Sequence, residues 1–143
     1  RTGGTASNFT GPDGDASANG AGKYIYTEAD QGSKNDKAHI ITPCLDLGSY
    51  SCALLEFDYH MYGAHVDFLA VTADTGFNTS AYTGLARIDL AQQSKSTDPW
   101  KTYSVSLNDI VGDYARIRFS VNRGNASKGD VAIDNIRVYE PEP

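Results

Sequence analysis

The chain has 143 residues and a formal net charge of −6, which is enough length for one domain with a substantial core. Its acidic balance argues against a surface that binds nucleic acid or anionic lipid. No apolar run approaches the roughly eighteen residues that a membrane-spanning helix needs, so we expect a soluble domain without membrane insertion.

Residues 1–22 are rich in glycine, asparagine and aspartate and show no hydrophobic period, a composition typical of successive turns. Residues 1–8 are compatible either with a disordered tail or with an ordered loop. From Phe9 onward the segment carries two acids, Asp13 and Asp15, and it leads into an alternating strand over residues 23–28.

Large apolar side chains alternate with polar ones over residues 53–63, and Gly63 ends the pattern. This period of two predicts a strand with one buried face. The apolar set is Leu55, Phe57, Tyr59 and Met61. Such a row needs a second sheet opposite it, so we expect this segment to be a central strand of a two-sheet sandwich.

Six further segments have strand-like patterns separated by polar loops or proline. They are residues 38–43, 66–72, 82–90, 100–107, 115–121 and 131–138. Asn108 can start a single helical turn. In the last segment the apolar phase shifts after Ile133, which indicates either a bulge at Asp134–Asn135 or a strand buried on both faces.

The sequence therefore predicts an all-β fold, an antiparallel two-sheet jelly-roll sandwich of about eight strands with no substantial helix. We expect a single domain over residues 1–139. Residues 140–143, Glu-Pro-Glu-Pro, have the composition of the start of a linker.

Cys44 and Cys52 stand close together in the sequence. They could be two unrelated buried thiols, but we favour a disulfide across a short strand connection, worth about 2–3 kcal/mol. A disulfide would indicate an oxidising, extracellular compartment. Three glycosylation sequons, at Asn8, Asn78 and Asn125, give weak support to secretion.

Several motifs follow one another in an order that resembles a MAM domain. They are Thr10-Gly-Pro-Asp-Gly-Asp15, residues 22–28, Ile41-Thr-Pro43, residues 52–63 with their Tyr-His-Met-Tyr-Gly core, Trp100, and Gly129-Asp-Val-Ala-Ile-Asp-Asn-Ile136. MAM domains are adhesion modules of meprins, neuropilins and receptor tyrosine phosphatases, and they also occur in many secreted bacterial proteins. The resemblance implies a non-catalytic interaction module of a secreted or cell-surface multidomain protein.

The chain departs from the family pattern in two respects. The sequence does not contain the aromatic strand and the Asp-Trp pair that usually precede the position of Arg1, which have been either trimmed or cleaved away. If that strand is truly absent, its neighbour in the sheet has an unpaired edge. Animal members commonly have four cysteines, one of them after the last strand, whereas this chain has two. The proposed Cys44–Cys52 pair is therefore inferred from spacing and is not inherited from the family.

Four carboxylates, Asp13, Asp15, Glu28 and Asp134, are candidates for a cation site at one edge of the sandwich. Calcium takes about six to eight hard oxygen ligands, often from loops. The resemblance implies that some MAM domains hold a structural cation between the N-terminal loop and the last strand. We therefore expect structural Ca²⁺ or Na⁺; the alternative is that the two N-terminal acids are turn residues and that Asp134 caps a bulge.

Catalytic constellations are incomplete. Glu56 and Asp58 match the first part of a jelly-roll glucanase motif, but His60 and Met61 stand where the second carboxylate of a retaining pair would be. His60 and His65 face different directions, and no cysteine or third histidine accompanies them as a zinc ligand. There is no Gly-x-Ser-x-Gly elbow either, so we expect no enzyme activity.

Aromatic residues allow a second interpretation. Tyr62, Tyr82 and Trp100, with Tyr24 and Tyr26, could form a platform for a sugar, although most of them could instead fill the core or its rim. The leading hypothesis is a module that binds a protein partner or a copy of itself. The alternative is a carbohydrate-binding module attached to a secreted hydrolase or protease, with a polysaccharide as its ligand.

Overall fold

The computed structural model describes residues 1–17, 19–76, 82–112 and 114–142. These residues form nine strands and one short 3-10 helix. The elements are β1 (Ile25–Thr27), β2 (Lys37–Ile41), β3 (Leu45–Asp46), β4 (Leu54–Met61), β5 (Val66–Asp74), β6 (Thr83–Asp89), β7 (Lys101–Ser106), η1 (Asn108–Ile110), β8 (Tyr114–Arg123) and β9 (Val131–Tyr139). No α-helix occurs in these ranges, and hence none of a length that spans a membrane.

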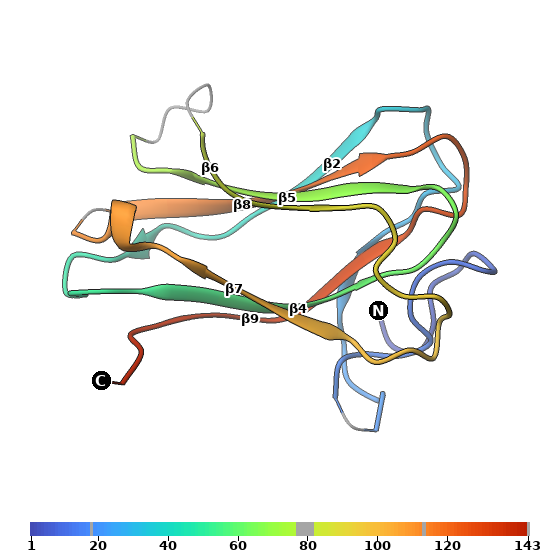
Figure 1. Ribbon diagram of the computed structural model, residues 1–143, viewed down its shortest axis with the longest axis horizontal. Helices are drawn as coiled ribbons and strands as arrows, with labels where there is room; N and C mark the ends of the chain where they lie inside the picture. The colour runs from blue at the N-terminus through green and yellow to red at the C-terminus, as the bar shows by residue number, and fades with distance from the viewer. Residues whose placement is uncertain (18, 77–81, 113, 143) are drawn as a thin grey trace.

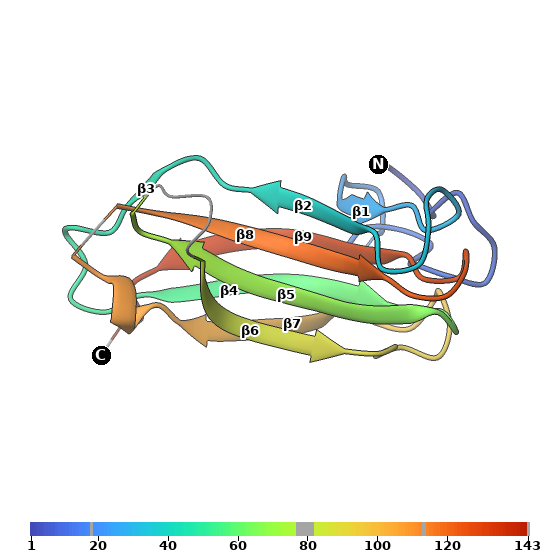
Figure 2. The same cartoon turned by 90° about the horizontal axis from the view of Figure 1, so that it is seen from above.

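The strands form two layers that face each other (Figures 1 and 2). One sheet has the order β1-β9-β4-β7, and the other has the order β2-β8-β5-β6 with β3 paired to β8. Except for β2–β3 and β5–β6, each strand is followed by a strand of the opposite sheet. This alternation of antiparallel strands is the jelly-roll arrangement, so the predicted fold is confirmed. Only the two-residue strand β3 had no counterpart among the eight predicted strands.

Strand β4 is the central strand that the alternating pattern predicted, because it pairs with both β9 and β7. Its apolar face is buried, with Leu55, Phe57 and Met61 at 0% exposure and Tyr59 at 6%. The Phe57 ring stacks on Tyr103 of the same sheet, with ring centroids 5.8 Å apart. The expectation that this row forms the contact between the sheets is therefore confirmed.

The facing strand β8 supplies the other side of this contact. Ala115, Ile117 and Phe119 alternate inward and are almost fully buried. The Phe119 ring meets Phe57 edge to face, with centroids 5.1 Å apart and an interplanar angle of 85°, an arrangement favoured by the quadrupoles of the two rings. Apolar side chains of both sheets thus share one core.

Strand β9 contains the bulge that the shift of phase indicated. Asp134 pairs with Asp58 and Arg137 pairs with Glu56, so two residues of β9 lie opposite the single residue Phe57. The first of these two residues, Asn135, has a φ of +48°, a left-handed conformation that asparagine tolerates better than most residues. The break in alternation is therefore a local distortion of the strand.

The N-terminal segment folds over one end of the sandwich (Figure 1). The amino group of Arg1 donates to the carbonyl of Tyr24 at 2.7 Å, and the Gly11 amide donates to the carbonyl of Tyr62 at 2.8 Å. The hydroxyl of Ser7 bonds Glu28 at 2.6 Å. These contacts attach the segment to residues far along the chain.

Replacing Phe57 by alanine should lower the free energy of unfolding by about 3–5 kcal/mol, because the change removes a buried ring and leaves a cavity between the sheets. Urea denaturation followed by fluorescence measures this loss. The control Ile41→Ala, at a position of β2 that is 44% exposed, should lose less than about 1 kcal/mol. Similar losses for the two variants would contradict the assigned core.

Candidate functional site

His60 lies on the polar face of β4 and yet is fully buried. The N-terminal loop and Trp100 cover it: the Trp100 ring is 5.7 Å from the imidazole, centroid to centroid, and its Nε1 donates to the carbonyl of Gly14 at 3.2 Å. One end of the outer face of the four-stranded sheet is therefore closed.

Burial determines the protonation of His60. Neither ring nitrogen has a hydrogen-bond partner in bonding geometry. Desolvation lowers the pKa of His60 to about 4, although the nearby backbone of Asp98 and the carboxylates of Asp13 and Asp98 oppose this shift. The imidazole is therefore neutral at pH 7. No cluster of three or more metal-ligating side chains occurs in the described ranges, so His60 and His65 are not part of such a group.

The structure does not bring the four candidate carboxylates together as one ligand set. Asp15 accepts from the hydroxyl of Ser17 at 2.8 Å, and the Ser17 bond and neighbouring backbone amides lower the pKa of Asp15 despite its desolvation. Asp134 accepts from the Ala16 amide at 3.1 Å. Asp134 thus attaches the N-terminal loop to β9, a role that the sequence did not indicate.

The remaining two candidates lie apart from that contact. Glu28 accepts from the hydroxyls of Ser7 and Tyr26, at 2.6 and 3.2 Å. Asp13 is exposed, and its backbone amide donates to the carbonyl of Ser96 at 3.3 Å. Consequently the four acids do not form the single constellation expected from the sequence.

A different acid, Asp130, has a carboxylate oxygen without a hydrogen-bond partner. It is completely buried just before β9. Its Oδ1 accepts from the Ala29 amide at 2.8 Å, whereas its Oδ2 has no hydrogen-bond partner. Thr5 lies nearby, but its hydroxyl donates to the carbonyl of Thr10 at 3.0 Å. Desolvation raises the pKa of Asp130 to about 6.

An unpartnered buried carboxylate oxygen is costly and is what a hard cation would satisfy. The hydroxyl and carboxylate oxygens of Thr5, Glu28 and Asp130 belong to three segments that meet here: the N-terminal loop, the β1–β2 loop and the start of β9. Sequence analysis missed Asp130 because a Gly-Asp pair ahead of a strand has the appearance of an ordinary turn.

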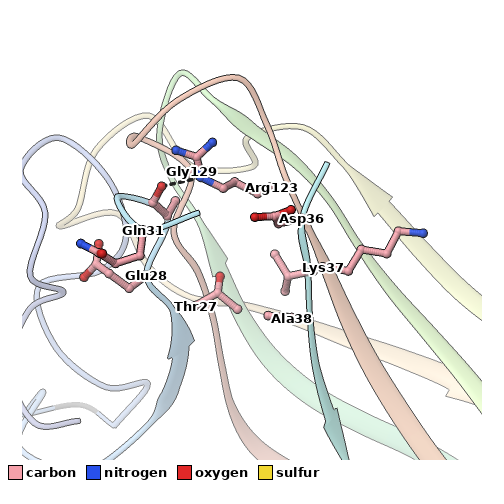
Figure 3. Close-up of a pocket in the computed structure, with 10 residues that line it drawn as sticks. Thr27, Glu28, Gln31, Asp36, Lys37, Ala38, Arg123 and Gly129 are labelled. Carbon is pink, nitrogen blue, oxygen red and sulfur yellow. Dashed lines mark hydrogen bonds between the residues drawn. The ribbon is translucent and has the colours of Figure 1, made fainter. Parts of the chain in front are cut away.

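A small pocket of about 110 Å³ opens beside this region, between the β1–β2 loop and the end of β8 (Figure 3). Glu28, Gln31, Asp36 and Arg123 line it. Arg123 is fixed there by a bond from its Nε to the carbonyl of Ala29 at 2.7 Å. The pocket has room for an ion with a few waters.

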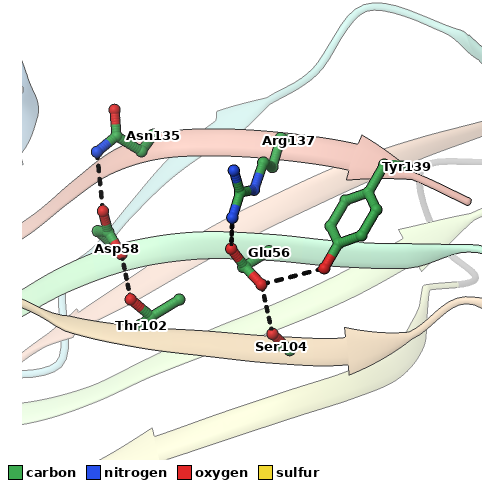
Figure 4. A network of polar contacts seen from close by, with 7 residues as sticks. All are labelled: Glu56, Asp58, Thr102, Ser104, Asn135, Arg137 and Tyr139. Carbon is green, nitrogen blue, oxygen red and sulfur yellow. Dashed lines mark hydrogen bonds and ion pairs between the residues drawn. The ribbon is translucent and has the colours of Figure 1, made fainter. Parts of the chain in front are cut away.

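Glu56 and Asp58 lie on the open part of the outer face of the four-stranded sheet (Figure 4). Asp58 accepts from the hydroxyl of Thr102 at 2.6 Å and from the amide of Asn135 at 2.8 Å. Glu56 is paired with Arg137, and this hydrogen bond is the main cause that lowers the pKa of Glu56. A carboxylate held in its ionised form is unsuited to the general-acid role that glycoside hydrolysis needs.

The candidate sugar-binding aromatics do not share one surface. Trp100 is part of the cover over His60. Tyr62 forms an isolated bridge to Gln93. Tyr82 precedes β6 and lies under the guanidinium of Arg118, 3.6 Å from its ring centroid. Tyr82 and Trp100 are therefore separated, because they precede strands of different sheets, β6 and β7.

The outer face of the five-stranded sheet carries ordered arginines. Besides the Arg118–Tyr82 pair, Arg87 lies 3.8 Å over the Phe68 ring and bonds Asp89 at 2.7 Å. Stacking and ion pairing restrict these side chains. They give this face a fixed set of planar cationic groups.

The predicted disulfide is not present in the structure, in which Cys44 and Cys52 are both free thiols; Cys44 is exposed and Cys52 is half-buried. Of the three sequons, Asn8 and Asn125 are exposed. Asn78 lies outside the described residues.

Comparison with known proteins gives a consistent result. The family model for the MAM domain, meprin/A5/mu, matches residues 1–142. Over 119 residues the chain is 30% identical to neuropilin-1 of Homo sapiens, covering 83% of this chain and 12% of that protein. Over 141 residues it is 26% identical to MAM domain-containing glycosylphosphatidylinositol anchor protein 2 of Rattus norvegicus, covering 93% of this chain and 14% of that protein.

A solved structure is similar in fold. The K1 cleaved adhesin domain of Lys-gingipain from Porphyromonas gingivalis W83 superposes with a TM-score of 0.63 at 20% identity, covering 93% of this chain and 82% of that one. The curated relatives are much longer, and the chain spans less than a fifth of either.

The buried imidazole predicts a defined dependence of stability on pH. Because the folded pKa of His60 is about 4, below the unfolded value, its contribution to stability is complete above the unfolded pKa and is lost as the pH falls toward 4. Between pH 7 and pH 5 this dependence lowers the free energy of unfolding of the wild type by about 2 kcal/mol. The substitution His60→Phe should remove it.

Thermal unfolding of both proteins from pH 8 to pH 4.5 measures the effect. The difference in Tm between His60→Phe and the wild type should grow in favour of the variant as the pH falls. Melting curves that shift in parallel would show that His60 is not the buried neutral group described above.

Proposed function

This chain belongs to the MAM family, and we propose that it acts as a non-catalytic interaction module of a secreted or cell-surface protein. The family is one of adhesion-type domains, and one relative is by name a glycosylphosphatidylinositol anchor protein. Exposed sequons at Asn8 and Asn125 agree with an extracellular location. The paired state of Glu56 and Asp58 supports the absence of glycosidase chemistry.

The outer face of the five-stranded sheet is our candidate for the protein-binding surface. Arginine and aromatic residues are enriched at the centres of protein interfaces, and this face presents Arg87 over Phe68 and Arg118 over Tyr82. Side chains already held in place lose little conformational entropy on binding. The guanidinium groups favour a partner with acidic side chains, and a second copy of this chain, which has 18 of them, is one such partner.

We also propose a structural cation, Ca²⁺ or Na⁺, beside Asp130. The observation that supports it is the fully buried Oδ2 of Asp130, which has no hydrogen-bond partner. Asp130 and Glu28 would supply the carboxylate ligands, with hydroxyl and carbonyl oxygens of the adjoining loops completing the shell. Such an ion would hold the N-terminal loop, the β1–β2 loop and β9 together.

Charge reversal on the five-stranded sheet tests the adhesive role. Beads coated with the wild-type chain should cluster with one another or attach to a layer of epithelial cells. Arg118→Glu and Arg87→Glu should each reduce the retained beads at least about threefold, because a carboxylate would face the acidic partner. Counting of retained beads measures this.

The control Lys34→Glu makes the same change of charge at an exposed position of the β1–β2 loop and should bind as the wild type does. Thermal unfolding would verify that the variants are folded. Wild-type beads that neither cluster nor attach, or an equal loss in the Lys34 variant, would contradict the assigned function or its surface.

Asp130→Asn tests the cation. Millimolar Ca²⁺ should raise the Tm of the wild type by several degrees relative to chelator, because an ion that binds only the folded state stabilises it. The Asn variant should lose most of this gain. In chelator it should match or exceed the wild type, because it carries no unpaired buried charge.

Asp13→Asn serves as the control, since it makes the same change at an exposed acid of the N-terminal loop; its response to Ca²⁺ should be unchanged. If neither Ca²⁺ nor Na⁺ alters the melting temperature of the wild type, the structural cation is excluded. A loss of response in the Asp13 variant and not in the Asp130 variant would move the ion to the N-terminal loop.

A further inference from the structure

The outer face of the four-stranded sheet contains a polar hollow, about 400 Å³ in volume. It is lined by Glu56, Asp58, Thr102, Asn135, Ile136 and Arg137. Three strands contribute: β4 in the middle, with β9 and β7 on its two sides (Figure 4). This polar hollow lies on the opposite side of the molecule from the arginines of the five-stranded sheet.

Hydrogen bonds hold the side chains of the polar hollow in fixed positions. Both carboxylate oxygens of Asp58 accept a bond, one from the Thr102 hydroxyl and one from the Asn135 amide. Glu56 accepts from Ser104 at 2.9 Å and from the Tyr139 hydroxyl at 3.2 Å, and it is paired with Arg137. The groups are therefore organised before any ligand arrives, which reduces the entropic cost of binding.

The bulge in β9 contributes one of these groups. Asp134 pairs with the outward-pointing Asp58, so in a regular strand the next residue, Asn135, would point into the core. Its φ of +48° returns the side chain to the outer face, where it bonds Asp58. Bulges frequently re-aim a side chain next to a functional site.

The chemistry of the polar hollow selects the ligand. Carboxylate oxygens keep lone pairs for further hydroxyl donors, and Arg137, whose side chain is 65% exposed, has donors for hydroxyl acceptors. Neighbouring hydroxyls of a sugar ring offer this combination of donor and acceptor. The partly exposed Ile136 offers an apolar contact for the C–H face of a ring. Two carboxylates against one guanidinium disfavour an anionic ligand.

We propose that the polar hollow binds a neutral saccharide, with Asp58, Asn135, Glu56 and Arg137 bonding its hydroxyls. The volume is in the range of small-ligand sites and fits one or two sugar residues of a longer chain. This site is independent of the protein-binding surface, so the module could hold a glycan on one sheet and a protein on the other. It also differs from the sugar platform that the sequence predicted at Tyr62, Tyr82 and Trp100.

NMR titration of the ¹⁵N-labelled chain tests the proposal with laminarihexaose, mannohexaose and xylohexaose, and with a heparin hexasaccharide as the anionic probe. At least one neutral probe, at up to about 10 mM, should shift the amide signals of Glu56, Asp58, Thr102, Asn135 and Arg137. A dissociation constant near 1 mM, about −4 kcal/mol, would be detectable in this range. The heparin fragment should produce no shifts there.

Two variants locate the binding. Arg137→Ala should weaken it at least about tenfold, since it removes charge-assisted donors. Asn135→Gly should weaken it as well while accommodating the positive φ. Arg87→Ala is the matched control, because Arg87 also pairs with a carboxylate and lies over an aromatic ring, but on the other sheet; it should bind the sugar as the wild type does.

The dispersion of the amide signals verifies the fold of each variant, and Thr102→Ala provides a milder change if either one unfolds. The proposal is overturned if no neutral probe shifts these amides, if the shifts lie on the other sheet, or if the heparin fragment binds more tightly. Equal effects of Arg137→Ala and Arg87→Ala would also overturn it. None of these outcomes bears on the bead assay, so the two proposed functions fail separately.

Discussion

The packing of β4 against the facing sheet determines where every other group on that strand can lie. Burying Leu55, Phe57, Tyr59 and Met61 directs the side chains of the intervening residues away from the core. Glu56 and Asp58 must therefore stand on the outer face, between β9 and β7. A one-residue slip of register would exchange the two sets and destroy both the core and the polar face.

His60 follows the same rule of alternation and has a different environment. It points outward like Glu56 and Asp58, but the N-terminal loop and Trp100 exclude water from it. The outer face of the four-stranded sheet is thus divided into a closed end around His60 and an open end around Arg137. Only the open end is available to a ligand.

Two buried titratable groups, His60 and Asp130, lie in regions that the N-terminal loop helps to close. Each leaves at least one polar atom without a partner, and burial shifts the pKa of His60 down and that of Asp130 up. Both shifts favour the neutral form, as expected when desolvation dominates. For Asp130 a cation would reverse this preference, whereas the neutral imidazole of His60 packs against Trp100.

The sequence by itself determined the parts of the molecule that depend on short-range periodicity. The alternation along residues 53–63 predicted the central strand β4, and that along residues 115–121 predicted the strand β8. The change of phase near Asp134 indicated a bulge as one of two alternatives, and the bulge lies within a residue of that position. Family motifs distributed along the chain identified the domain type. These signals are local because side chains two residues apart share a face of any strand.

Only the tertiary structure decided which functional groups meet. Asp13, Asp15, Glu28 and Asp134 were grouped from their loop positions and the family resemblance. Asp134 instead binds the amide of Ala16, 118 residues away, and it is Asp130 that has a buried oxygen without a hydrogen-bond partner. Loop contacts of this range have no period and depend on how the chain closes over the sheet ends. The polar hollow likewise combines side chains from three strands, and only the register of β9 against β4 places Asn135 and Arg137 beside Asp58 and Glu56.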